Sequence, residues 1–347
     1  MGRYGVGDTR MARNIASIRV ETVWLLLLMA SLLLVSLPRF SRNDWGPLGR
    51  LTGQDSTVGA SNDSDKYITY VHYFRGDAGF GDLVVPFAYR PVVPWLAAWL
   101  PFEAMTSINI INFLSLLTTA ILLYRLSCSI GFSLRYAILA SFMFVVSFPT
   151  FYYGTIGMVD PVLILFLTMG LYFSLKRQWA QLLLTVTLGC LVKETMIVLI
   201  PVSVTCLILN REPWKLKSAL LLVAYLGPLL ATRLIFRGLV GTNYLQISFE
   251  SFLSNLRLRA LLSVTLTFGI PGLLSLFFLF RRWVVFDGAY EPAPLSILIP
   301  LAEGLLLSVI LCLYSMFSAH TDGRFIWTSY PFSIPLALWF LERRKRR

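Results

Sequence analysis

Acids, tyrosines and an arginine gather in one polar segment of a chain that is otherwise apolar. Residues 61–101 read SNDSDKYITYVHYFRGDAGFGDLVVPFAYRPVVPWLAAWLP and contain Asp63, Asp65, Asp77 and Arg90. Carboxylates accept protons, guanidinium groups bind anions, and loops often carry such groups on a regular scaffold. Arg90 lies in the apolar, proline-bracketed run PFAYRPVVP, where an arginine needs an anionic partner. This favours a functional site over the alternative, a solvated connector between two membrane helices.

A second set of ionisable side chains lies inside or beside apolar runs: Asp160, Lys193, Glu194, His320, Asp322 and Arg324. Such groups are costly within a membrane and usually functional. Each nevertheless has a simpler explanation. Lys193 and Glu194 can neutralise each other. Asp160, which precedes Pro161, can cap a helix. Asp322 and Arg324 can form a surface ion pair.

The composition determines the class of protein that must position these residues. The chain is 56% hydrophobic and 14% charged, with a mean hydropathy of +0.70, which is too apolar for a soluble domain. Apolar runs separated by short basic clusters are typical of an all-α, polytopic membrane protein. The formal net charge of +12 does not indicate nucleic-acid binding, because Lys and Arg stand in small groups at the ends of the apolar runs.

The four cysteines do not predict a disulfide framework or a metal site. Cys128, Cys190, Cys206 and Cys312 all lie inside or at the edge of apolar runs, and none shows CxxC spacing. We therefore expect them to be small buried residues of membrane helices.

The apolar runs predict about ten membrane crossings in a single integral membrane domain, residues 1–347. We expect a cytoplasmic N-terminus (1–22), a long extracytoplasmic loop with short surface helices (38–105), membrane helices (106–341) and a basic cytoplasmic tail (342–347). The alternative for the N-terminus, a cleaved signal peptide, lacks a clear small-residue cleavage site. No internal repeat is visible. The chain is expected in the plasma (inner) membrane, with both termini in the cytoplasm.

The segment from Trp179 to Asn210 decides this topology. Its only charges are Lys193 and Glu194, near its middle. A single tilted helix would place the later basic clusters on the extracytoplasmic side, whereas a hairpin of two short helices places all of them in the cytoplasm. The charge bias favours the hairpin, with Lys193 and Glu194 at its tip. Both ionisable sets then lie at the extracytoplasmic face, which suggests a cavity that opens outward there.

Several motifs resemble the GT-C fold membrane glycosyltransferases, including bacterial members. NDSDKYITY is similar to their acids ahead of a tyrosine-containing helix, and PFAYRPVVP to their proline- and arginine-rich turn. GMVDPVLILFLTMGLYFSLKRQW is similar to their Asp-Pro helix, LVKETMIVLIP to their Lys-Glu segment, and HTDGRFIWTSYPFSIP to their last Asp-x-Arg turn. The sequence departs from the family where Ser64 separates two acids that are adjacent in many members.

The resemblance implies transfer of a sugar from a polyprenyl-phosphate donor to an acceptor hydroxyl of a glycan, lipid or protein, such as a cell-envelope glycan. It makes Asp65 the expected general base, with Asp63 as the alternative. Arg90, then Lys193 and Arg324, are the expected partners of the phosphate. Asp160, Glu194, His320 and Asp322 are expected to line the substrate site, and Tyr67, Tyr70 and Trp95 to stack on sugars. Membrane lipids are further partners, and no nucleic acid is expected.

Two points stay open at the level of sequence. No acid or histidine cluster has convincing metal spacing, so no cofactor is certain and a divalent cation is optional. A transporter or flippase of a lipid-linked or small solute would also use charges along a pathway, and a polysaccharide polymerase or ligase would also use an outer loop. Transporter sites usually lie near the midplane with repeat symmetry, so we favour the enzyme.

Overall fold

The computed structural model describes residues 22–40, 62–241, 247–284, 294–318 and 321–345, which are mostly helical. The helices in the connections of the bundle are α3 (Asn62–Arg75), α4 (Val92–Ala98), α7 (Phe148–Tyr153), α12 (Phe249–Asn255) and α15 (Arg324–Trp327). The helices of the bundle itself are α5 (Ala104–Ser129), α6 (Leu134–Val145), α8 (Asp160–Leu175), α9 (Trp179–Val192), α10 (Leu199–Leu209), α11 (Trp214–Ile235), α13 (Leu258–Val284), α14 (Leu295–Ser318) and α16 (Tyr330–Lys345). The 3-10 helices are η1 (Leu37–Arg39), η2 (Phe80–Asp82), η3 (Phe87–Tyr89) and η4 (Glu194–Val198).

Four helices, α5, α11, α13 and α14, are long and apolar enough to cross a membrane. Shorter apolar helices cover Thr22–Ser36, Leu134–Val145, Asp160–Leu175, Trp179–Val192 and Glu194–Leu209. The predicted all-α, GT-C-like membrane architecture is confirmed at this level. One predicted element differs: the sequence suggested a turn at 149–153, where the chain instead forms α7.

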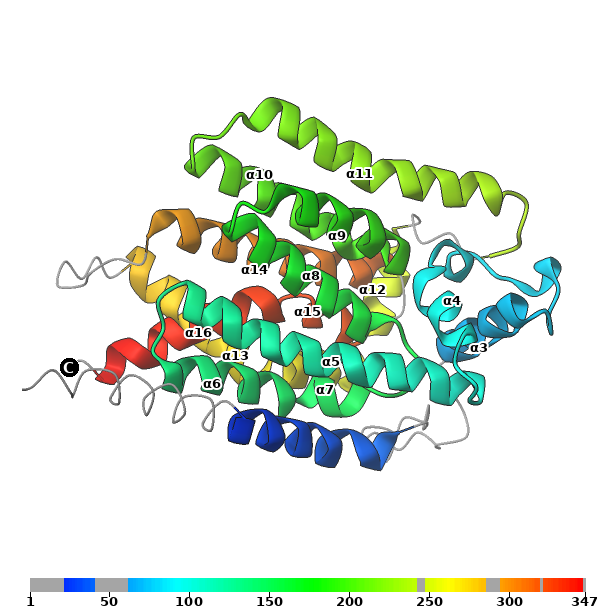
Figure 1. Ribbon diagram of the computed structural model, residues 1–347, viewed down its shortest axis with the longest axis horizontal. Helices are drawn as coiled ribbons and strands as arrows, with labels where there is room; N and C mark the ends of the chain where they lie inside the picture. Colours follow the sequence, from blue (N-terminus) through cyan, green and yellow to red (C-terminus); the bar gives the residue numbers. More distant parts are fainter. Residues whose placement is uncertain (1–21, 41–61, 242–246, 285–293, 319–320, 346–347) are drawn as a thin grey trace, which may run out of the picture.

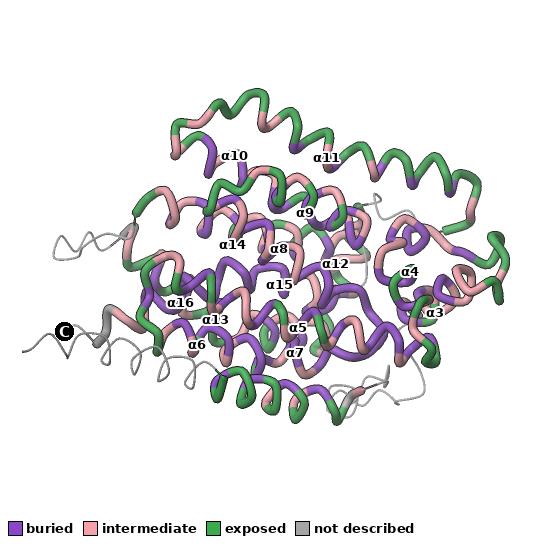
Figure 2. The backbone as a smooth tube through the Cα atoms, viewed as in Figure 1, coloured by how far each residue is buried: buried purple, intermediate pink, exposed green. Residues whose placement is uncertain are grey.

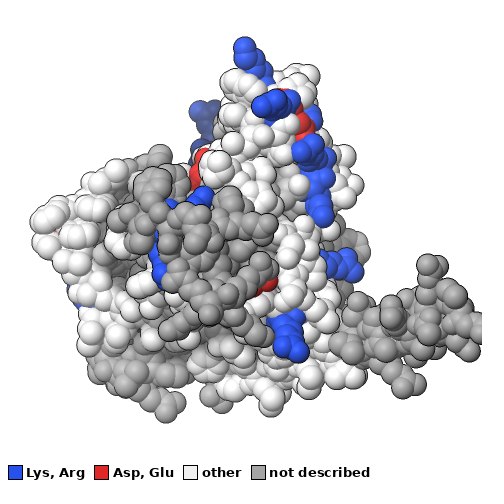
Figure 3. All heavy atoms as spheres, turned by 90° about the vertical axis from the view of Figure 1, so that its left-hand side faces the viewer, with Lys and Arg blue, Asp and Glu red and all other residues white. Residues whose placement is uncertain are grey.

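The helices run side by side between two ends of the molecule (Figure 1). We call the end that carries α3, α4 and α15 the site end, and the end that carries the α10–α11 connection the basic end. Arg177 Nη2 donates to Asn210 Oδ1 at 2.6 Å, so the α8–α9 and α10–α11 connections lie together. Figure 3 shows Lys and Arg side chains gathered at the basic end.

The chain reverses direction between α9 and α10, as the charge distribution predicts. Lys193 Nζ reaches Asp160 Oδ1, so the end of α9 lies beside the start of α8. Ser174 Oγ then pairs with Ser203 Oγ at 2.8 Å, while Leu199 packs closely on Gly170. Because these two contacts advance in the same sense along both helices, α10 runs parallel to α8. The Trp179–Asn210 segment is therefore a hairpin.

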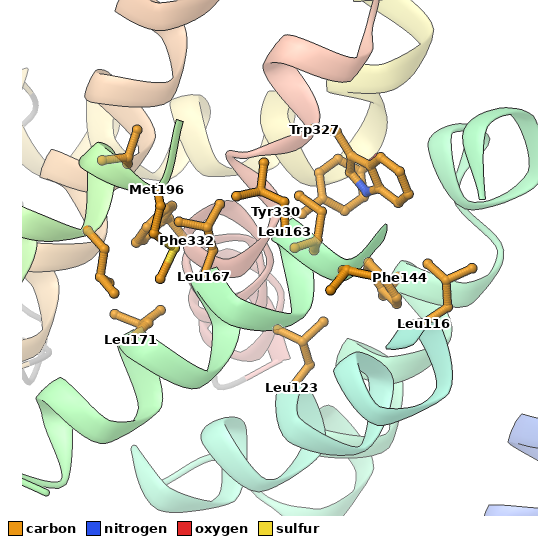
Figure 4. Close-up of a cluster of buried hydrophobic side chains, with 14 of the residues drawn as sticks. Leu116, Leu123, Phe144, Leu163, Leu167, Leu171, Met196, Trp327, Tyr330 and Phe332 are labelled. Carbon is orange, nitrogen blue, oxygen red and sulfur yellow. The ribbon is translucent and has the colours of Figure 1, made fainter. Parts of the chain in front are cut away.

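The centre of the bundle is formed around α16. Every residue from 326 to 339 is buried, on all sides of the helix (Figure 2). Figure 4 shows Phe332 and Tyr330 of this segment among Leu163 and Leu167 of α8 and Phe144 of α6. A helix that is apolar all round belongs in an interior or in lipid, and here it is interior.

Two helices depart from straight, packed geometry. Helix α13 is kinked at Gly269, whose φ of 49° and ψ of −156° break the helical pattern two residues before Pro271. Helix α11 packs against α9 and α10 and presents a largely exposed, apolar side (Figure 2). In a membrane, such a side would contact lipid.

Candidate functional site

The fold brings seven of the ionisable residues together at the site end. They come from α3, the loop before α4, the start of α8, the α9–η4 junction and the turn before α15. We call this set the ionic cluster: Asp63, Arg90, Asp160, Lys193, Glu194, Asp322 and Arg324. His320 lies outside the described residues.

Arg90 has the anionic partner that its apolar surroundings require. Its Nε donates to Glu194 Oε2 at 3.0 Å, its Nη2 donates to Glu194 Oε1, and its Nη1 donates to the hydroxyl of Tyr67 at 2.8 Å. Burial alone would lower the pKa of Arg90, but Glu194 and Tyr67 raise it well above the ordinary value. The guanidinium is therefore charged and held in one orientation by a bidentate pair.

Lys193 and Glu194 do not neutralise each other. Lys193 takes an extended backbone (φ −164°, ψ 139°) between α9 and η4, and its Nζ lies 2.6 Å from Asp160 Oδ1. Glu194 points instead to Arg90. The hydroxyl of Tyr225, from α11, donates to the Glu194 carbonyl at 2.6 Å and so satisfies a backbone group freed by the helix break. The break therefore sends two adjacent charges to two different partners.

Asp160 is more than a helix cap. It is the first residue of α8, it is buried, and its carboxylate faces Lys193 rather than the helix backbone. The loop before it is held from α5: Asn109 Oδ1 accepts from Gly157 N at 2.8 Å, and Asn112 Nδ2 donates to the Met158 carbonyl at 2.7 Å. Gly157 has a φ of +78°, a conformation that favours glycine.

Arg324 links the last turn to the first loop. Its Nε lies 3.0 and 2.8 Å from the two carboxylate oxygens of Asp322, and its Nη2 lies 3.0 Å from Asp63 Oδ2. Its Nη1 donates to the Met158 sulfur at 3.0 Å, a weak acceptor. The side chains of Arg324 and Asp322 are only 13% and 11% exposed, so they do not form a surface ion pair, the simpler explanation that the sequence allowed. Burial raises the pKa of Asp322, although Arg324 opposes this.

The two acids of the first loop face opposite environments. Asp63 joins the ionic cluster through Arg324 and keeps its side chain 34% exposed, whereas Asp65 is exposed outside it. Asp65, the general base expected from the sequence, therefore has its side chain outside the ionic cluster. Residues four and seven positions apart share a helix face, whereas residues two apart do not. Asp63 is the acid that precedes the two tyrosines by those intervals.

The two tyrosines are enclosed by protein. Tyr67 and Tyr70 are 2% and 1% exposed. Tyr67 packs edge-on against Phe87, and Tyr70 stacks on Phe74 with ring centroids 4.8 Å apart. Burial raises the pKa of both hydroxyls. The expectation that these rings stack on a sugar is not supported, because their faces are already covered. Trp95 is 47% exposed.

Several residues that shape the site were missed at the level of sequence. Tyr225, Asn109 and Asn112 lie in long apolar helices, where polar side chains at helical spacing were the only available signal. Met158 gave no such signal. Within the described ranges, no set of three or more His, Cys, Asp or Glu residues is arranged to hold a metal ion.

Residues 86–236 match the family model described as dolichyl-phosphate-mannose-protein mannosyltransferase. This match confirms the resemblance to the GT-C membrane glycosyltransferases. The matched residues include Arg90, Asp160, Lys193 and Glu194 of the ionic cluster. No curated protein and no solved structure shows significant similarity to the chain. The class of protein that the match supports is a membrane glycosyltransferase.

The geometry separates two kinds of group in this glycosyltransferase-like site. Arg90 and Lys193 are enclosed and hold carboxylates of other helices, so they fix the relative positions of α3, α8 and η4. Asp63 and Arg324 adjoin each other where the cluster is partly exposed. A proton acceptor and a phosphate-binding group are therefore available side by side.

Proposed function

We propose that this chain transfers a sugar from a polyprenyl-phosphate-linked donor to an acceptor hydroxyl, with the site end at the extracytoplasmic face of the plasma membrane. One observation carries the proposal: Asp63, an acid whose side chain is one-third exposed, adjoins Arg324, whose Nη1 donates to the thioether sulfur of Met158. A thioether is a poor acceptor, and a phosphate oxygen is a far better partner for the same N–H.

The proposed step uses these two adjoining groups, Asp63 for the acceptor hydroxyl and Arg324 for the donor phosphate. The acceptor hydroxyl attacks the anomeric carbon while Asp63 takes its proton. The bond from the anomeric carbon to the phosphate oxygen breaks, and its electron pair goes to the phosphate. The donor diester thus leaves as polyprenyl phosphate, and Arg324 stabilises the charge that develops on it.

Arg90 and Lys193 act in this proposal as positioning residues. Their carboxylate partners already occupy them, and removing one member of a buried pair leaves the other charge uncompensated. They hold the hairpin tip and the start of α8 against the first loop. Asp63 is preferred over Asp65 as the base because Asp63 joins the ionic cluster, whereas Asp65 is exposed outside it. Arg324 is preferred over Arg90 as the phosphate ligand because its Nη1 donates to a thioether, a weak acceptor that a phosphate oxygen can replace.

The orientation in the membrane follows from charge. The basic end carries Arg177, Arg211, Lys215 and Lys217 on neighbouring helix connections. The positive-inside rule places such connections in the cytoplasm. The donor and the acceptor would then meet on the other side, and both termini would be cytoplasmic.

A transfer assay tests the function. The purified full-length protein in liposomes is given radiolabelled polyprenyl-phosphate mannose, or another polyprenyl-phosphate hexose or pentose, and an envelope fraction as acceptor. We expect the label to move to the acceptor with release of polyprenyl phosphate, and Asp63→Asn to prevent this. Label that stays on the lipid but crosses between leaflets would indicate the transporter instead.

A further inference from the structure

The ionic cluster carries more negative than positive charge. Its acids are Asp63, Asp160, Glu194 and Asp322, and its bases are Arg90, Lys193 and Arg324. Four negative and three positive groups leave a net charge of −1. A donor phosphodiester would add a further negative charge, and an uncompensated charge in a poorly solvated site is costly. Binding of the donor therefore calls for another cation beside the cluster.

Arg259 is a described cation beside the cluster. It is half-buried, it follows Leu258 at the start of α13, and it lies close enough to Asp322 for the two opposite charges to attract each other. Both oxygens of Asp322 are bound by Arg324 Nε, and burial still raises the pKa of Asp322. A second positive charge near Asp322 is thus electrostatically favourable.

The start of α13 faces the turn that holds Asp322 and Arg324. Ser263 Oγ accepts from Gly323 N at 2.8 Å, and there is no room for a side chain at Gly323 beside Thr267. Ser263 lies four residues after Arg259, so the two side chains share one face of the helix. Arg259 therefore lies on the side of α13 that meets the turn holding Asp322 and Arg324. Arg257, two residues earlier, is exposed.

An apolar stripe runs along α13 from this point. Its exposed members are Leu266 before the kink at Gly269, and Ile270, Leu273, Phe277 and Phe280 after it. The last four follow one another at intervals of three or four residues and so form one face. The segment Leu258–Arg282, which holds Arg259 and this stripe, is long and apolar enough to cross a membrane. A cation at the head of a bilayer-long apolar stripe matches the chemistry of an isoprenoid phosphate.

We propose that Arg259 binds the donor phosphate together with Arg324, and that the polyprenyl tail lies along the exposed stripe of α13. This rests on the proposed function. When the bond to the anomeric carbon breaks, its electron pair passes to the phosphate, whose charge changes from −1 to −2 while Asp63 gains the proton. Arg259 and Arg324 oppose this increase of negative charge on the leaving group.

The matched pair Arg259→Gln and Arg257→Gln tests the phosphate contact in the full-length protein. We expect Arg259→Gln to lower kcat/KM for the donor by about tenfold or more, the value of one charge-assisted hydrogen bond, and Arg257→Gln to leave it nearly unchanged. A structural role alone would lower Tm without raising the donor KM. Equal donor KM and kcat in both variants would overturn the assignment.

Binding of short-chain polyprenyl phosphate, measured as a shift of Tm, separates this proposal from the function itself. The wild type and Arg257→Gln should be stabilised and Arg259→Gln should not, whether or not sugar transfer is detected. Ligand stabilisation that persists in Arg259→Gln would contradict the proposal.

A crosslinking measurement on the wild type does not depend on any variant folding. Polyprenyl phosphate with a photoreactive tail should label residues 266–280 of α13. Labelling of the exposed face of α11, around Leu226, Leu230 and Leu234, would place the tail elsewhere and overturn the assignment.

Discussion

At the residue scale, the site depends on which of two neighbouring acids turns inward. Asp63 precedes Tyr67 by four residues and Tyr70 by seven, so a helix puts all three on one face. Asp65 is displaced by about 200° from that face and is exposed. The helical spacing was available in the sequence. The pairing of Lys193 with Asp160 and of Glu194 with Arg90 could not be predicted from the sequence, because it depends on how distant helices pack.

These pairings predict how single and double substitutions affect stability. Lys193→Met and Asp160→Asn each remove one member of a pair whose side chains are 9% and 3% exposed. Each should destabilise the protein by about 3–5 kcal/mol, since it strands a buried charge. The double variant should be more stable than the sum of the two effects predicts. Thermal unfolding in detergent measures this, and strict additivity would show that the pair is not coupled.

At the scale of the elements, hydropathy and charge together predicted the hairpin of α9 and α10. Apolar length alone would have allowed one long helix, and the basic groups on either side decided between the two. The kink of α13 at Gly269 and the enclosure of α16 were not predicted. Both depend on how the helices pack side by side. An apolar segment has the same sequence pattern whether its side chains contact lipid or protein.

Close packing of α14 on α16 provides a test at this scale. A Cβ at Gly304 would lie 2.3–2.6 Å from the ring of the buried Phe332, whereas one at Gly227 of α11 would meet nothing within 4 Å. Gly304→Ala should therefore cost about 1–3 kcal/mol. Gly227→Ala should be neutral or stabilising by about 0.5–1 kcal/mol. Equal Tm values for the two variants would contradict the α14–α16 contact.

At the scale of the whole molecule, the ends of the bundle differ in chemistry. Ion pairs between helices are concentrated at the site end. The Asp-Pro and Lys-Glu motifs, which are distant in the chain, lie close together there. The sequence predicted this segregation, because alternating crossings return every second connection to the same side. It could not reveal that Arg90, Lys193 and Arg324 are each paired with an acid from another segment.

Reporter fusions test this orientation. Fusions after Arg177, Arg211 and Arg282 should read cytoplasmic, and fusions near Ser61 and His320 should read extracytoplasmic. The fusion after Arg211 is the most informative, because it follows the hairpin. An extracytoplasmic reading there would be incompatible with the reversal at Lys193 and with a site end on one side of the membrane.

The central claim is that Asp63 takes the proton of the acceptor hydroxyl beside Arg324. The direct measurement compares the sugar-transfer rates of Asp63→Asn and Asp65→Asn, with donor binding followed separately. Both changes keep the shape of the side chain and remove its basicity. We expect Asp63→Asn to lower the rate by about 10²–10⁴-fold with donor binding retained, and Asp65→Asn to stay near the wild-type rate. Near-normal turnover in Asp63→Asn, or a larger loss in Asp65→Asn, would contradict the assignment.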